Sequence, residues 1–122
     1  MLNHKLLPNE GILILEPTVP LESDDFETLA KVIDPYIDEH GKLSGVMIHA
    51  KSFPGWVNIE AFFTHMRFIE SHHKNIQRLA VVSDSYLLKE MPKLADHLLD
   101  AEVKHFAESK YEDAMQWLGG KS

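Results

Sequence analysis

Short apolar runs alternate along this sequence with segments of helical periodicity, and this alternation constrains the fold more than any other feature. Runs rich in β-branched residues predict strands over 1–7, 11–16, 45–50, 78–83 and 101–106. Apolar residues recurring every three or four positions predict helices that begin near residues 23, 58, 85 and 109. Strands that alternate with helices indicate a mostly parallel sheet with right-handed crossovers. We therefore expect an α/β fold in the order ββαβαβαβα, with helices packed on a mixed, mostly parallel five-stranded sheet.

The first two predicted strands flank the turn-like segment Pro8–Gly11. The run Ile12–Leu15 is continuously apolar, which is typical of a strand buried on both faces. We therefore expect an antiparallel hairpin that adds one edge strand to the parallel part of the sheet.

The ends of the first predicted helix are marked by suitable residues. Ser23 is a candidate N-cap and Gly41 a candidate stop, while Pro35 should interrupt and kink the helix near Asp34.

Two of the later predicted helices also have candidate residues at their start. Asn58 is a suitable opening residue for the second helix, and Ser109 with Glu112 forms the pattern of a capping box on the last. The apolar stripe expected to be buried on the second helix consists of Ile59, Phe62, Phe63, Met66 and Ile69. The corresponding stripe on the third helix consists of Leu87, Leu88, Met91, Ala95 and Leu98.

Length, charge and cysteine content exclude several classes of protein. A chain of 122 residues fits one domain, which we expect to span 1–122. A net charge of −7 opposes binding to nucleic acid, and the absence of cysteine excludes disulfides and thiolate chemistry. No apolar run approaches the roughly 20 residues of a spanning helix, and no signal peptide is evident. We expect a bacterial-type cytoplasmic protein, with peripheral association at the inner membrane face left open.

Three stretches of sequence carry a resemblance to a known family. They are the loop Phe53–Trp56, the run Leu79–Asp84 and the ending Glu112–Leu118. Together with the order of elements, they resemble the SpoIIAA-like branch of the STAS-type domains, over nearly the whole chain. The resemblance implies a STAS-type fold, which is itself similar to lipid-binding CRAL-TRIO domains, and it brings no catalytic residue with it.

The same resemblance raises the question of a regulatory phosphorylation. In STAS-type anti-sigma antagonists, a serine at the start of the second helix is phosphorylated and switches partner binding. The corresponding stretch 50–58 keeps only Ser52, beside an inserted aromatic turn rather than on the helix cap. A phosphate there would lack the free amides of a helix N-terminus, so Ser52 as an ordinary loop hydroxyl is the simpler interpretation.

The loop 53–57 is unusual because it carries three large apolar side chains where a loop is normally polar. It follows a predicted parallel strand, and open α/β sheets bind ligands at that edge. Two interpretations stay open. Phe53 and Trp56 cover the core, or Trp56 lines a nonpolar pocket or contacts a membrane surface.

Neither a metal site nor an enzyme is indicated by the motifs. The eight histidines include the adjacent pair His72 and His73 but no His-x-x-x-His pairing. Ser83–Tyr86 lies at a strand end, yet the chain lacks a Gly-x-Ser-x-Gly elbow and any nucleotide-binding glycine motif. We expect no catalytic residue, no metal and no cofactor.

These observations favour a small binding module that holds a nonpolar molecule or lipid, with weak membrane-surface contact as a further option. The residues expected to line its site are Phe53, Trp56, Val57, Phe62, Phe63, Leu87, Leu88 and Met91. The alternative is a protein-interaction regulator that resembles the anti-sigma antagonists and uses the loop around Ser52. An enclosed apolar pocket would favour the first hypothesis, and a filled surface with an exposed Ser52 would favour the second.

Overall fold

The computed structural model describes residues 2–86, 88–90 and 99–119. Five strands form one sheet in the spatial order β1-β2-β3-β4-β5. They are β1 (Asn3–Leu7), β2 (Ile12–Glu16), β3 (Leu43–His49), β4 (Ile76–Val82) and β5 (Glu102–Phe106). The pair β1–β2 is antiparallel and the other three pairs are parallel, as predicted. The expected α/β fold with a mixed, mostly parallel five-stranded sheet is confirmed.

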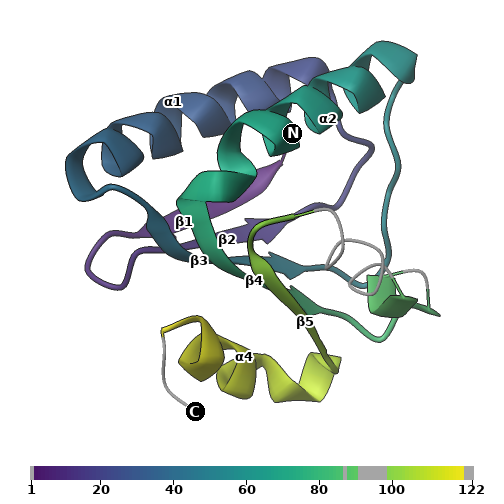
Figure 1. Cartoon of the computed structure of the whole chain (residues 1–122). Helices are drawn as coiled ribbons and strands as arrows, with labels where there is room; N and C mark the ends of the chain where they lie inside the picture. The colour runs from purple at the N-terminus through teal and green to yellow at the C-terminus, as the bar shows by residue number, and fades with distance from the viewer. Residues whose placement is uncertain (1, 87, 91–98, 120–122) are drawn as a thin grey trace.

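Helices cover both faces of this sheet. Helices α1 (Ser23–His40) and α2 (Ile59–His72) lie together on one face, and α4 (Tyr111–Leu118) lies on the other (Figure 1). Short 3-10 turns, η1 (His73–Asn75) and η2 (Glu108–Lys110), follow α2 and precede α4. Of the third predicted helix, Tyr86 and 88–90 are helical, whereas Leu87 and 91–98 lie outside the described residues.

The two faces of the sheet have separate apolar cores. On the α1 and α2 side, Leu13 and Val46 pack with Phe26, Leu29 and Ile33 of α1. The opposite core contains Ile12, Ile14, Met47, Ala80, Val82, Ala114 and Leu118. Consecutive residues of β2 thus enter opposite cores, which explains why this strand is apolar without alternation.

The start of α1 differs from the prediction. Glu22, not Ser23, is the N-cap, and the backbone amide of Glu22 donates to the Asp25 carboxylate at 2.9 Å. Asp25 is buried and also accepts from the backbone amide of Leu2 at 3.0 Å. The Ser23 hydroxyl instead lies 3.1 Å from the Thr64 hydroxyl and links α1 to α2.

The end of α1 is as expected, although Pro35 does not interrupt the helix. Proline removes one amide donor, yet the helix continues through it to His40. Gly41 ends the helix with a φ of 90°, and its amide donates to the Ile37 carbonyl at 2.6 Å. At the last helix, Ser109 lies within η2 and α4 begins at Tyr111 after Lys110, so the predicted capping box does not form.

The stripe predicted to be buried on α2 is wrong at two of its five positions, while Phe62, Met66 and Ile69 are partly buried. Ile59 is 68% exposed and Phe63 is 52% exposed. The side that packs inward contains the small Ala61 and three rings, those of His65, Phe68 and His72. Histidine counts as polar in a periodicity analysis, but these imidazoles are stacked on aromatic neighbours in the interior.

Candidate functional site

The loop 50–58 leaves the carboxyl end of β3 and is fixed to the segment before α1. The Leu21 amide donates to the Gly55 carbonyl at 2.8 Å, and the Val57 amide donates to the Leu21 carbonyl at 2.9 Å. Gly55 has a φ of 85°, a conformation that other residues rarely adopt. Asn58 then caps α2 as predicted, because its side-chain oxygen accepts from the Ala61 amide at 2.8 Å.

The Trp56 side chain points back toward α2. Its ring makes edge contacts with Phe53 and Phe62, each with centroids 4.8 Å apart. Its indole Nε1–H donates to Nδ1 of His65 at 3.1 Å. Phe53 and Trp56 are both partly buried against the core beneath α1, so they cover that core.

His65 is held between this loop and α1. Its ring stacks on Phe26 with centroids 4.5 Å apart and an interplanar angle of 17°. Burial lowers the pKa of His65 to about 4, because the charged imidazolium would lose its hydration. The imidazole is therefore neutral at pH 7, with Nδ1 as the acceptor for Trp56.

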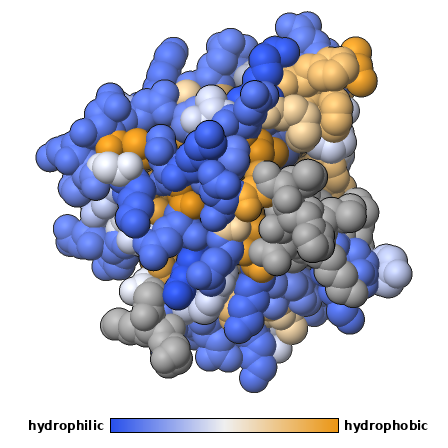
Figure 2. Space-filling model, in the orientation of Figure 1, coloured by the Kyte–Doolittle hydropathy of each residue, from blue (hydrophilic) through white to orange (hydrophobic). Residues whose placement is uncertain are grey.

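Three large apolar side chains remain exposed beside this loop. Val57 is 50% exposed and lies just before Asn58, the N-cap of α2, and α2 carries the exposed Ile59 and Phe63 one turn apart. Figure 2 shows an apolar area at the upper right, where the N-terminal end of α2 lies in Figure 1. We call Val57, Ile59 and Phe63 the α2 apolar surface.

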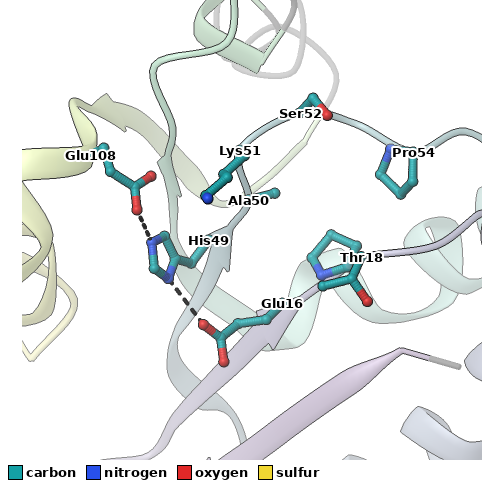
Figure 3. Close-up of a pocket in the computed structure, with 9 residues that line it drawn as sticks. Glu16, Thr18, His49, Ala50, Lys51, Ser52, Pro54 and Glu108 are labelled. Atoms are coloured by element: carbon teal, nitrogen blue, oxygen red, sulfur yellow. Dashed lines mark hydrogen bonds and ion pairs between the residues drawn. The ribbon is translucent and has the colours of Figure 1, made fainter.

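A separate hollow of about 410 Å³ lies at the carboxyl ends of β2 and β3. It is lined by Glu16, Pro17, Thr18, His49, Ala50, Lys51, Ser52, Pro54 and Glu108. His49 lies between two carboxylates, with Nδ1 3.1 Å from Glu16 and Nε2 2.5 Å from Glu108 (Figure 3). Its lining combines the charged Glu16, Lys51 and Glu108 with Pro17, Ala50 and Pro54, so it is mixed rather than the apolar pocket expected for a nonpolar ligand.

The two carboxylates lie on opposite sides of the His49 ring, so the three groups do not converge on one point. Among residues 2–86, 88–90 and 99–119, no three histidine or acidic side chains are arranged to hold a metal ion. The Tyr111 ring makes an edge contact with His49 at 5.0 Å. The pKa of Tyr111 is raised, first by burial and then by the charges of Glu16 and Glu112.

The residues that the sequence nominated for a ligand site fall into different environments. Phe53, Trp56 and Phe62 form the aromatic cover, whereas Val57 and Phe63 are exposed. Leu88 is buried in a small cluster with Ala50 and Val81, and Phe53 packs against it. Leu87 and Met91 lie outside the described residues.

Ser52 is exposed and lines the same hollow, where Figure 3 shows it farther along the loop from His49. Two residues of this region were not singled out from the sequence, His65 and His49. His65 lies nine positions after Trp56 and carries no motif of its own. The side of β3 on which His49 lies depends on the sheet register, which only the structure provides.

The sheet order, the helices on both faces and the loop after β3 define a STAS-type domain. Residues 12–119 match the SpoIIAA-like family, and the chain belongs to that family. The fold is similar to the crystal structure of an uncharacterized DUF3478-family protein with a SpoIIAA-like fold from Shewanella loihica PV-4. That similarity has a TM-score of 0.76 at 18% identity, over 97% of this chain and 92% of the other.

No curated protein matches the sequence. Of the helices that the structure describes, none combines the length and the apolar character needed to cross a membrane.

Proposed function

We propose that this chain is a protein-interaction module that binds its partner through the α2 apolar surface and catalyses no reaction. The observation that carries the proposal is the exposure of Val57, Ile59 and Phe63, which are each at least half exposed at one end of the helix layer. Clustered exposed apolar side chains of this kind mark interaction sites more often than isolated ones do. The resemblance to anti-sigma antagonists, which act by binding a protein, supports the same function.

A protein partner fits these observations better than a nonpolar small molecule or a membrane. The Trp56 ring is already in contact with Phe53, Phe62 and His65, and the lining of the hollow beside Ser52 includes the charged side chains Glu16, Lys51 and Glu108. The net charge of −7 opposes contact with anionic lipid. The exposed side chains therefore suit an apolar patch on another protein.

The test is quantitative affinity capture with the tagged chain and an extract of the cells from which it comes. The double variant Ile59→Ser/Phe63→Ser should reduce the affinity for the partner by at least roughly 100-fold, because each apolar side chain buried in an interface contributes about 1.5–3 kcal/mol and two are removed. Val19→Ser is the matched control, because Val19 is another exposed apolar side chain but lies outside α2.

Unchanged recovery with the double variant would contradict the proposal. So would cosedimentation of the parent chain with phosphatidylcholine vesicles that the double variant abolishes, since that result would assign the surface to lipid.

A further inference from the structure

We propose that His65 is a positioning residue for the α2 apolar surface, whose neutral imidazole holds the loop 53–57 through Trp56 and whose protonation releases it. The inference rests on the proposed function for what the surface does. The role of His65 in holding the loop is independent of any partner and is tested on the chain alone.

Among the described residues, the loop 53–57 makes one side-chain hydrogen bond and two backbone hydrogen bonds to the rest of the fold. The two backbone hydrogen bonds join Gly55 and Val57 to the same residue, Leu21. Among the described residues, Trp56 joins the loop to α2 by its hydrogen bond to His65, beside its ring contact with Phe62. Val57 belongs to the apolar surface, is the next residue after Trp56 and also donates to the Leu21 carbonyl, so a displacement of Trp56 acts directly on this hydrogen bond.

The direction of this hydrogen bond requires one protonation state. An indole nitrogen is only a donor, so Nδ1 of His65 must carry its lone pair and the ring hydrogen must be on Nε2. Protonation of Nδ1 would place two N–H groups against each other at 3.1 Å, and the bond would be lost. The Phe26 ring covers one face of the imidazole and helps to hold His65 in place on α2.

Burial lowers the pKa of His65 to about 4, which keeps the bond intact at neutral pH and breaks it in acid. The loop residues 53–57 include no ionisable side chain. Among the described residues of α1 and α2, the buried ionisable side chains are Asp25 and His72. Asp25 accepts two backbone amides, and Nε2 of His72 lies 2.7 Å from the Asp34 carboxylate.

The first test removes the donor at neutral pH. Trp56→Phe keeps an aromatic ring over the core but has no indole hydrogen. Hydrogen exchange at the Leu21 and Val57 amides should become about fivefold faster, as expected when one hydrogen bond is lost. Exchange at Ala114, on the opposite face of the sheet, is the internal control. Unchanged exchange at the Leu21 and Val57 amides would overturn the proposal.

The second test follows the Trp56 indole resonance and the His65 ring by NMR as the pH falls from 7.5. In the parent chain both signals should shift together, with a midpoint near the His65 pKa of about 4. In His65→Gln, whose side-chain oxygen can accept the same hydrogen but does not titrate, the indole signal should stay constant. His40→Gln, at an exposed histidine of α1, should behave like the parent.

An indole signal that moves equally in His65→Gln and in the parent would assign the change to another group and overturn the proposal. If the parent unfolds before His65 takes up a proton, the Trp56→Phe result at neutral pH decides. The two proposals fail separately. A confirmed His65 role with unchanged capture by Ile59→Ser/Phe63→Ser would remove only the proposed function.

Discussion

The environment of His65 shows how burial alone changes the role of an ionisable side chain. Phe26 covers one face of the ring and Trp56 donates to Nδ1, and burial is the cause of the lowered pKa. An exposed histidine with the same neighbours in sequence would carry charge over a much wider range of pH. Nothing in a single sequence distinguishes His65 from the exposed His40, because burial is a tertiary property.

The lowered pKa of His65 predicts a pH-dependent stability with a defined sign. The folded value is about 4 and the unfolded value about 6.5, so between these pH values the unfolded state binds more protons. The contribution is fully present above about pH 6.5 and is lost as the pH falls through the folded pKa. Over pH 7 to 4 the loss amounts to about 3 kcal/mol.

Urea unfolding of the parent and of His65→Gln at a series of pH values measures this contribution. The decrease in unfolding free energy between pH 7 and pH 4 should be about 3 kcal/mol smaller in the variant. Identical pH profiles for the two chains would show that His65 does not contribute to acid sensitivity.

At the scale of elements, the strands were predictable and the facing of α2 was not. β-Branched runs between turn signals located all five strands within one or two residues of their observed ends. The apolar pattern of α2 contains two candidate stripes, and the chosen one left out His65 and His72. The stripe through Ala61 lies inward because its small side chain permits close packing and because the two histidine rings stack on Phe26 and Phe68.

The contact between β3 and α4 gives a prediction at the same scale. Gly45 lies beneath α4, and a Cβ there would be 2.5 Å from Cδ2 of Leu118. Gly45→Ala should therefore destabilise the chain by about 1–3 kcal/mol through overpacking. Gly119→Ala is the control, since its Cβ would meet only ordinary contacts at 3.6 Å. Equal stability of Gly45→Ala and the parent, by thermal or urea unfolding, would mean that α4 shifts without cost.

At the scale of the whole molecule, one sheet separates two cores that share no buried side chain in the described part of the chain. The proposed function involves only the face of the sheet that α1 and α2 cover. The Glu16–His49–Glu108 contacts join the ends of β2 and β3 to η2 at the edge of the sheet. The sequence predicted this architecture from the order of elements, but the contacts across the edge depend on strand register.

The separation of the two cores predicts that changes on opposite faces act independently. Ile33 lies in the α1 core, and Ile33→Val should cost about 0.5–1.5 kcal/mol. Combined with Gly45→Ala, its effect on the unfolding free energy should add to within about 0.5 kcal/mol, because the two sites share no packing partner. The pair Gly45→Ala and Leu118→Ala should instead be non-additive, since Leu118→Ala removes Cδ2 and Cγ, two of the three Leu118 atoms nearest to the new Cβ, and leaves only the Leu118 Cβ close to it at 2.8 Å. Coupling between Ile33 and Gly45 as large as that between Gly45 and Leu118 would show that the sheet transmits packing changes from one face to the other.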